Sequence, residues 1–415
     1  MSAKAGFPRA LWALAAVILL IGRSAAAQFL DQTPEQKFQI DPAHLAKPYA
    51  SDSVDNSPDI VARPDVPFFR LPPGFAVNEF AGGFKYPRWL AVAPNGDVFL
   101  TLPLSGKVML LHDGNGDGRA ELTSTFAAGF KRPHGLAFHD GYLYVADVNR
   151  VWRLAWRAGE TKAQGPAEPV TNAGVFGSAE GHWTRNIVFA PDGKRFFVTV
   201  GSASNLGEDP PPRASVQSFA ADGSDQRTLA TGLRNSVGIA YRPDTNDLYV
   251  VVNERDGLGD DLVPDYLTRV REGGFYGWPY AYIGANPQPD FPSRPNLVAK
   301  AIVPDLLFQA HSAPLGLAFY EGRMFPPDYR GDAFVALHGS WNSGQPTGYK
   351  IVRVPFKNGK PAGYYENFLT GFWIGGRMPA KVWGRPVALA VAADGSLLIS
   401  DDASGSIWRI SYKKP

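Results

Sequence analysis

Residues 87–101 read PRWLAVAPNGDVFLT, in which a proline and an apolar pair lead through an Asn-Gly turn into alternating apolar residues. Two period-two strands joined by Asn-Gly or Asp-Gly are typical of a β-hairpin, because these residues accept the backbone angles of a tight turn. The pattern occurs six times, at 87–101, 133–147, 184–200, 236–252, 314–325 and 386–401. The sequence therefore predicts an all-β fold built from a repeated hairpin.

A further apolar strand follows several of the hairpins, as in KVMLLHD at 107–113, RVWRLAW at 150–156, YKIVRVPF at 349–356 and SIWRISY at 406–412. Four strands make one propeller blade, and six radial blades leave only short, protected edges around a channel. The hairpins start about 45 to 80 residues apart, beyond the ~40 to 50 of regular propeller repeats, and the excess lies in Pro- and Gly-rich insertions. We expect a six-bladed β-propeller over residues 71–415. A β-sandwich of similar hairpins is the alternative.

The composition narrows the class of partner. The chain has 41 Lys and Arg residues against 39 Asp and Glu, so its net charge is close to zero and would attract neither nucleic acid nor an anionic membrane. A small substrate is therefore favoured. Cysteine is absent, which excludes disulfides, thiolate metal sites and a Cys nucleophile. The motifs GxGxxG, HExxH and GxSxG and the P-loop do not occur, so nicotinamide binding, zincin, α/β-hydrolase and NTPase chemistry have no support.

The N-terminal residues read as a targeting segment followed by an arm. Residues 1–27 combine Lys4 and Arg9, an apolar stretch at 10–22 and the small residues 25–27, which predicts a secretory signal peptide. The alternative is a membrane anchor, but about 13 apolar residues fall short of the ~20 that span a bilayer. We expect a periplasmic or secreted protein with no membrane span after cleavage. Residues 28–70, polar and without periodicity, predict an extended arm wrapped on the domain or trailing from it.

Residues just before the first strand of each repeat are expected to ring one mouth of the channel. Many of them are Arg, Lys or His. Such residues pack poorly in a hydrophobic core but bind a polyanionic ligand well. The expected ring consists of Arg88, Lys131, Arg132, His134, His182, Arg185, Arg234, Asn235, His311 and Arg385.

Three of these stretches carry possible chemistry. His182 suits a general base, because an imidazole titrates near working pH; a histidine satisfied by loop carbonyls is the alternative. Arg234 beside Asn235 offers a planar fork for a carboxylate or quinone oxygen, unless the arginine bridges neighbouring blades. Trp341 or His338 could stack on or bond a flat cofactor, although an aromatic residue at a strand end is often plain packing.

Two acidic loops are candidates for calcium. Residues 253–261 read NERDGLGDD and supply carboxylates and exposed carbonyls, the ligands that Ca²⁺ prefers; a solvated turn is the competing interpretation. Residues 113–118 read DGNGDG, with the spacing of the start of an EF-hand loop, but Ser124 stands where the twelfth-position Glu belongs. Calcium there would brace a blade, and an empty turn is an equal alternative.

Eight ordered motifs together resemble the soluble glucose and sorbosone dehydrogenase family, with the L-sorbosone dehydrogenase branch the most similar. The resemblance runs from about Leu71 to the C-terminus. It implies a six-bladed propeller that binds pyrroloquinoline quinone (PQQ) and a calcium ion over the channel mouth and oxidises sugars in the periplasm. The motifs are LPPGF at 71–75, GHWTRN at 181–186, GLRNSVGIA at 232–240, NERDGLGDDL at 253–262, GGFYGWP at 273–279, HSAPLGLAFY at 311–320, HGSWN at 338–342 and GRPVALA at 384–390.

The resemblance also implies roles for single residues. His182 matches the base that removes the substrate hydroxyl proton while hydride passes to the quinone. Arg234, Asn235 and Arg385 match cofactor-binding positions, and Arg88 and Trp341 complete the set that we expect to hold the cofactor. Calcium is expected on the backbone carbonyls of Arg255 and Asp256.

Two departures from the family pattern stand out. The glucose dehydrogenases orient their histidine with carboxylates, where this chain has Gly181 and then Gly201-Ser202, and their cofactor-facing lysine falls near Trp341-Asn342.

The predicted function is oxidation of an aldose, sorbosone or related hydroxyaldehyde, with PQQ passing electrons to an unidentified acceptor. A calcium-dependent propeller lactonase is an alternative, but it needs several carboxylates and Asn residues converging on the axis, which looks cationic in this sequence. A non-catalytic extracellular binding propeller is the third possibility.

Overall fold

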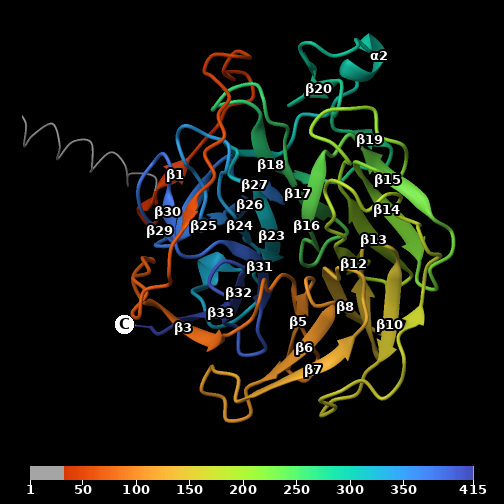
Figure 1. The fold of residues 1–415 in the computed structure, drawn as a ribbon, viewed down its shortest axis with the longest axis vertical. Helices are drawn as coiled ribbons and strands as arrows, with labels where there is room; N and C mark the ends of the chain where they lie inside the picture. Colours follow the sequence, from red (N-terminus) through yellow and green to blue (C-terminus); the bar gives the residue numbers. More distant parts are fainter. Residues whose placement is uncertain (1–31, 415) are drawn as a thin grey trace, which may run out of the picture.

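The structure is a computed structural model that describes residues 32–414, so the predicted signal segment 1–27 lies outside the described residues. Six sheets of four or five strands make up most of it, and in Figure 1 they follow one another around the molecule from orange to blue. The prediction of an all-β fold is confirmed. Within residues 32–414, helix is limited to short pieces such as α2 (Pro295–Val298) and the 3-10 helix η2 (Pro327–Tyr329).

Each large sheet has an antiparallel pair of strands at its inner edge, and in five of the six sheets this pair is the predicted hairpin. In chain order, the first three sheets contain β4 (Leu90–Val92), β5 (Val98–Leu102), β6 (Lys107–His112) and β7 (Leu122–Ala128); β8 (Gly135–His139), β9 (Tyr142–Ala146), β10 (Val151–Ala155) and β11 (Glu168–Pro169); and β12 (Ile187–Phe189), β13 (Arg195–Val200), β14 (Ser215–Ala220), β15 (Arg227–Thr231) and β19 (Gly274–Phe275).

The other three sheets follow the same plan, and two of them gain an outer strand from the N-terminal part. They contain β16 (Asn235–Tyr241), β17 (Leu248–Asn253), β18 (Pro264–Arg269) and β22 (Leu306–Ala310); β23 (Pro314–Phe319), β24 (Ala333–Leu337), β25 (Lys350–Val354), β28 (Tyr365–Leu369) and β1 (Lys37–Phe38); and β31 (Pro386–Val391), β32 (Leu397–Asp401), β33 (Ser406–Tyr412) and β3 (Phe75–Ala81).

The remaining strands of the described residues form three small sheets. They are formed by β2 (Asp59–Ile60), β29 (Trp373–Gly375) and β30 (Lys381–Val382); by β20 (Ala281–Tyr282) and β21 (Asn286–Pro287); and by β26 (Phe356–Lys357) and β27 (Lys360–Pro361).

The first strands of the six large sheets form a closed cycle. Strand β4 contacts β8, β8 contacts β12, β12 contacts β16, β16 contacts β23, and β23 contacts β31. Strand β31 contacts β4, which closes the cycle. These inner strands are crowded. A Cβ on Gly316 would lie 2.4 Å from the Val387 carbonyl oxygen, so only glycine allows β23 to approach β31 this closely. The core lies between neighbouring sheets, where apolar side chains such as Phe99 and Leu110 are buried.

One predicted hairpin is wrong in its second strand. Residues 314–325 were expected to hold both strands, but β23 is followed by a long connection, and its partner β24 begins at Ala333. The pair Pro326-Pro327 explains the difference, because proline lacks the N–H that a paired strand donates and here begins η2. Phe325 is still buried, as a packing residue of the connection.

The N-terminal arm lies along the domain. Strand β1 pairs with β28, and β2 runs parallel to β30. Between them, the buried Asn56 joins two loops: its side-chain amide donates to the carbonyl oxygens of Ser343 at 2.7 Å and Arg377 at 2.8 Å, and its backbone N–H donates to that of Trp341 at 2.8 Å. The arm therefore braces the loop that carries Trp341. Among residues 32–414, no helix is long and apolar enough to cross a membrane.

Replacing Asn56 with Ala is expected to lower the free energy of unfolding by about 2 kcal/mol, because two buried carbonyl groups lose their donor. Chemical denaturation measures this change. The variant Asn115→Ala, in an exposed loop, is the control and should change the free energy of unfolding by less than about 0.5 kcal/mol. Equal stability of the Asn56 variant and the control would show that the arm is not a brace.

Candidate active site

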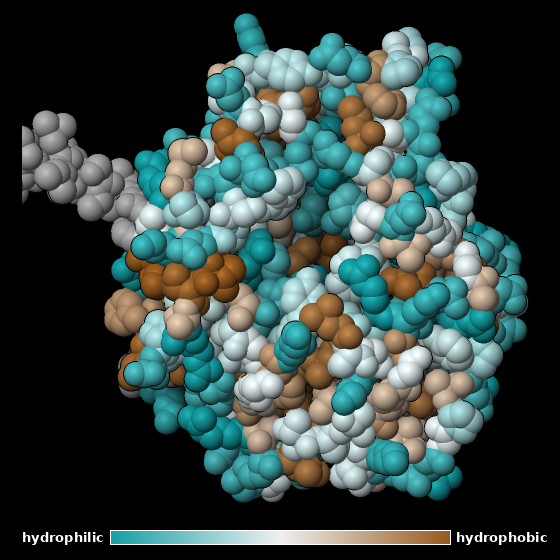
Figure 2. Space-filling view, in the orientation of Figure 1, coloured by the Kyte–Doolittle hydropathy of each residue, from teal (hydrophilic) through white to brown (hydrophobic). Residues whose placement is uncertain are grey.

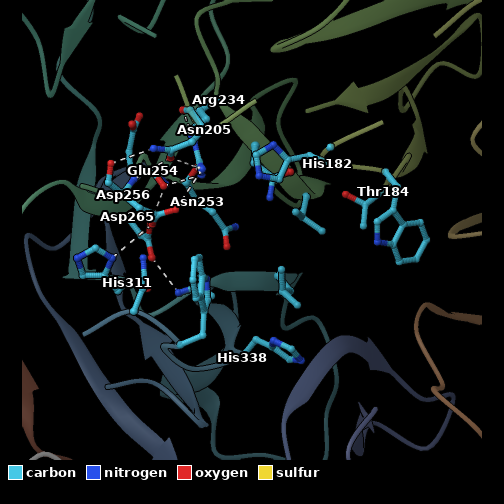
Figure 3. A pocket seen from close by; sticks show the side chains of 18 of the residues that line it. His182, Thr184, Asn205, Arg234, Asn253, Glu254, Asp256, Asp265, His311 and His338 are labelled. Atoms are coloured by element: carbon cyan, nitrogen blue, oxygen red, sulfur yellow. Dashed lines mark hydrogen bonds and ion pairs between the residues drawn. The ribbon is translucent and has the colours of Figure 1, made fainter. Parts of the chain in front are cut away.

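A cavity of about 580 Å³ lies where loops from five of the six large sheets meet. The loops precede the first strands or follow the second strands, as the sequence predicted for functional residues. Figure 2 shows that this face of the molecule is hollowed near its middle, and Figure 3 shows His182, Arg234, His311 and His338 around the cavity. Its polar lining includes Arg88, His182, Thr184, Asn205, Arg234, Asn235, Asn253, Glu254, Asp256, Asp265, His311, His338, Asn342 and Arg385.

The expected ring of ten residues is only partly correct. Lys131, Arg132, His134 and Arg185 do not line the cavity, whereas Arg88, His182, Arg234, Asn235, His311 and Arg385 do.

Packing explains the four exceptions. The guanidinium of Arg185 donates to the carbonyl oxygens of Ser178, His182 and Thr184, and Lys131 and Arg132 are exposed. His134 is buried against the rings of Trp89 and Trp183, at centroid distances of 5.1 and 5.5 Å.

His182 lies on the loop before β12 and presents one ring edge to the cavity. Its Nδ1 lies 2.9 Å from the hydroxyl oxygen of Ser202 and 3.0 Å from the Ser202 carbonyl oxygen. Within the described residues, Nε2 has no hydrogen-bond partner in the protein, and Figure 3 shows the ring directed into the cavity. Burial, followed by the charge of Arg234, lowers the pKa of His182 to about 3, so the imidazole is neutral at working pH.

Arg234 bridges two neighbouring sheets. Its Nε donates to the Asn205 carbonyl oxygen at 3.0 Å, one Nη donates to the Glu254 carbonyl oxygen at 2.6 Å, and the other donates to the Asn205 Oδ1 at 2.7 Å. The guanidinium is buried yet lines the cavity. Because its donors already have protein partners, Arg234 supplies positive charge to the cavity more than free N–H groups.

Asn235 and Thr184 supply polar atoms without protein partners. The Oδ1 of Asn235 and the hydroxyl of Thr184 are buried and accept or donate no hydrogen bond within the described residues, although both residues line the cavity. Gly201 makes this arrangement possible, since a Cβ there would lie 2.6 Å from both the Asn235 Oδ1 and the His182 Cβ. Buried polar groups without partners are costly, so these atoms are suited to a bound polar ligand.

One wall of the cavity carries carboxylates, so the axis that looked cationic from the sequence also has an acidic side. Asp265 accepts backbone N–H groups from Glu254 and Ala313, each at 2.8 Å, and burial raises its pKa to about 7. The carboxylate of Asp256 lies 3.5 Å from the Nδ1 of His311. Burial acts to raise the pKa of Asp256, but His311 and Arg234 outweigh burial, so the pKa of Asp256 is lowered.

One of the two carbonyls expected to bind calcium has another contact. The Asp256 carbonyl oxygen accepts the side-chain amide of Asn205 at 3.0 Å. Arg255 does not line the cavity; its guanidinium is buried against Glu254 and Gln288. Within residues 32–414, the one group of three or more His, Cys, Asp or Glu with ligand atoms within 4.8 Å of one another is Asp113, Asp117 and Glu121, in the second acidic loop.

A buried Asp on the last sheet organises the opposite wall. Asp402 bonds the guanidinium of Arg88 at 2.6 Å and the Nε2 of His338 at 3.0 Å. Burial and the charge of Arg385 lower the pKa of His338 to about 4, and the Nη2 of Arg385 donates to the Gly339 carbonyl oxygen at 2.8 Å. Trp341 lines the same wall with 47% of its surface exposed, which leaves its indole accessible for stacking.

Two residues of the site were not predicted from the sequence, and Ser202 was named only as a departure from the family pattern. Ser202 and Asn205 lie in the loop after β13, and Asp402 directly follows β32. Their positions after second strands were the available signal, because every such loop returns to the mouth where the first strand begins. The ends of β17 and β24 followed that rule and were found.

Two family models match the chain. The TrAA12-like model matches residues 69–265 and 297–413, and the glucose/sorbosone dehydrogenase model matches residues 214–340. The family resemblance read from the eight motifs is confirmed, while the sorbosone branch stays a prediction.

Curated relatives share about a quarter of their residues with this chain. An uncharacterized protein of Borreliella burgdorferi is 28% identical over 361 residues, covering 83% of this chain and 91% of that one. A PQQ-dependent pyranose dehydrogenase of Coprinopsis cinerea is 25% identical over 414 residues, covering 81% of this chain. The match spans 54% of the dehydrogenase, about half its length.

Solved structures show the same fold. The holo form of the PQQ domain of the Coprinopsis cinerea pyranose dehydrogenase aligns with a TM-score of 0.68 at 22% identity, covering 86% of this chain and 99% of that one. The soluble aldose sugar dehydrogenase of Escherichia coli, in its apo form, aligns with a TM-score of 0.60 at 17% identity, covering 82% and 100%. Because the TrAA12-like model matches well over half of its residues, this chain belongs to the TrAA12-like family.

Proposed function

We propose that this chain is a quinoprotein sugar dehydrogenase that binds PQQ in the 580 Å³ cavity and oxidises an aldose, sorbosone or a related hydroxyaldehyde. The observation that carries the proposal is the convergence of a neutral imidazole, His182, with three guanidinium groups, those of Arg88, Arg234 and Arg385, on one cavity. The named relatives that depend on PQQ agree with it. We take the six sheets to be the six blades of a propeller.

The cavity fits a flat quinone with several carboxylates. Three guanidinium groups surround it, and Asn235 and Thr184 offer buried polar atoms without partners. Arg88, Arg234, Asn235, Arg385 and the accessible ring of Trp341 are the residues proposed to hold PQQ. When bound, PQQ supplies a two-electron oxidant that accepts hydride.

The proposed chemistry of the chain itself is proton removal. The Nε2 of His182 takes the proton of the substrate hydroxyl, and a hydride leaves the carbon that bears this hydroxyl. The alcohol or hemiacetal carbon thereby becomes a carbonyl. The charges of Arg234 and Arg385 would favour a bound group that gains negative charge as it accepts hydride. An external electron acceptor, which is unidentified, would complete the turnover.

We propose that calcium binds beside the cofactor and takes no part in the proton transfer. The carbonyl oxygen of Asp256 already accepts a hydrogen bond from Asn205, so the expected ligation at 255–256 rests more on the Arg255 carbonyl. Glu254 Oε1, which has no hydrogen-bond partner among the described residues, is a further oxygen donor to the ion on that wall. No step of the proton transfer depends on the ion.

The competing lactonase has less support. The cavity does contain carboxylates and Asn residues, but Asp265 is engaged by backbone N–H groups, Glu254 by Arg255, and Asp256 by His311 and Arg234. The described residues that could converge on a metal lie elsewhere, at Asp113, Asp117 and Glu121. Export to the periplasm or the exterior remains a proposal that rests on residues 1–27 of the sequence.

The test is reconstitution of the purified, cofactor-free protein with PQQ, with and without Ca²⁺. Dye reduction is followed with a panel of aldoses and sorbosone, and lactone hydrolysis is assayed in parallel. Bound quinone absorbance with sugar-dependent dye reduction is the expected result. Lactone hydrolysis without quinone binding would favour the lactonase, and neither activity would favour a binding protein.

A further inference from the structure

We propose that Ser202 is the positioning residue of His182: its hydroxyl oxygen accepts the Nδ1–H of the ring and fixes the tautomer that leaves Nε2 free to accept a proton. The proposal rests on the dehydrogenase function proposed above and names the group that replaces the orienting carboxylate, which this chain lacks at Gly181 and Gly201-Ser202.

The hydrogen-bond directions follow from the number of protons available. The Ser202 Oγ lies 2.6 Å from the Ser204 carbonyl oxygen, which can only accept, so the single hydroxyl proton is donated there. Toward the Nδ1 of His182, at 2.9 Å, the hydroxyl therefore presents only lone pairs. The proton on that edge of the ring must belong to Nδ1, and neutral imidazole then carries its lone pair on Nε2.

The Ser202 carbonyl oxygen is a poorer partner for the same nitrogen. It lies 3.0 Å from Nδ1, but it also accepts the backbone N–H of His182 at 3.0 Å and a guanidinium N–H of Arg213. A carbonyl oxygen has two lone pairs, and these two donors occupy them. The hydroxyl oxygen is the acceptor that remains for the ring.

The loop around Ser202 is itself fixed in place. Ser202 is fully buried. The carboxylate of Asp209 accepts the backbone N–H of Ala203 and, at 3.3 Å, the hydroxyl of Ser204, which sets the position of the Ser204 carbonyl. Arg213 also donates to the Ser178 and Glu180 carbonyl oxygens, so it fastens the loop that carries His182 to Ser202.

A hydroxyl partner differs from a carboxylate in one measurable respect, because it orients the ring without adding negative charge. The charged groups around His182 are Arg234 and Arg213, which lower its pKa, and Asp256, which raises it; Arg185 also donates to its carbonyl oxygen. A neutral partner leaves burial, followed by the cationic groups, as the dominant influence on the His182 pKa, so the ring stays unprotonated in acid. A carboxylate at position 202 would favour the imidazolium.

The first measurement needs no cofactor and no activity. In protein labelled with ¹⁵N-histidine, the ring nitrogens of His182, assigned by loss of signal in His182→Gln, are expected to show the proton on Nδ1 from neutral pH down to about pH 4. A proton on Nε2 in the wild-type protein would overturn the proposal, whatever the enzyme oxidises.

The second measurement uses variants of the PQQ-loaded enzyme. Ser202→Ala is expected to lower kcat about tenfold with little change in KM, the equivalent of one lost hydrogen bond to the base, and to give mixed tautomers. Ser202→Asp is expected to keep the Nδ1–H tautomer and to move the acid limb of the kcat/KM profile to higher pH by about one unit or more. Ser396→Ala, which removes a buried hydroxyl bonded to Asp394, is the matched control with unchanged kcat.

The outcomes separate the two proposals. A wild-type tautomer and kcat in Ser202→Ala, or an unmoved acid limb in Ser202→Asp, would refute the role of Ser202 while leaving the dehydrogenase intact. Absence of sugar oxidation in the wild-type enzyme would refute the dehydrogenase, while the ring-nitrogen measurement still tests the hydrogen bond on its own.

Discussion

Replacing His182 with Ala is expected to lower kcat by about 10²- to 10⁴-fold, the usual contribution of a positioned general base, while the protein still binds PQQ. The base acts in the transition state, whereas cofactor binding is assigned to the guanidinium groups and to Asn235, so the two properties should separate. Dye reduction at saturating sugar measures kcat, and titration of quinone absorbance measures binding.

A histidine outside the cavity provides the control for that experiment. His112 is partly exposed and pairs with Asp97 at 2.6 Å, and it does not line the cavity. His112→Ala should retain the wild-type rate. If His182→Ala also retained it, another group would have to be the base, and His338, oriented by Asp402, would be the next one to replace.

Replacing Arg234 with Ala is expected to weaken PQQ binding by about 10²-fold or more and to lower the free energy of unfolding by about 3 to 5 kcal/mol. The guanidinium is buried and satisfies the carbonyl groups of Asn205 and Glu254, so its removal takes a positive charge from the cavity and leaves buried acceptors without donors. Equilibrium binding of PQQ and chemical denaturation measure the two effects.

Two further arginine variants sharpen the Arg234 prediction. Arg234→Lys keeps the charge but not the fork, and should recover part of the binding and little of the stability. Arg153→Ala removes a partly exposed ion pair with Glu168 and should cost less than about 1 kcal/mol with no change in binding. Unchanged PQQ affinity in Arg234→Ala would mean that Arg234 only joins the two sheets.

Local patterns predicted the sheets well because a hairpin is encoded by neighbouring residues. Asp140 and Gly141, for example, both have the positive φ angles that a tight hairpin turn requires. The exception, the connection between β23 and β24, depends on proline residues that follow the apparent turn. Nothing in the alternation of residues 314–325 reveals that the partner strand begins later.

Local sequence patterns predicted only part of the site. His134 and His182 both lie before the first strand of a repeat, but His134 is covered by Trp89 and Trp183 whereas His182 faces the cavity. That difference is made by side chains from other repeats. Asp402 was missed for the same reason, because its partners Arg88 and His338 are distant in the sequence.

The pairing of β3 with β33 has a consequence for biogenesis. Phe75 lies opposite Tyr412, so the sixth sheet takes its outermost strand from the start of the domain and its other strands from the end. A chain still emerging from the ribosome cannot complete that sheet, and until the last residues arrive, β3 has no strand to pair with. Truncation before Ser406 should therefore yield an aggregation-prone product.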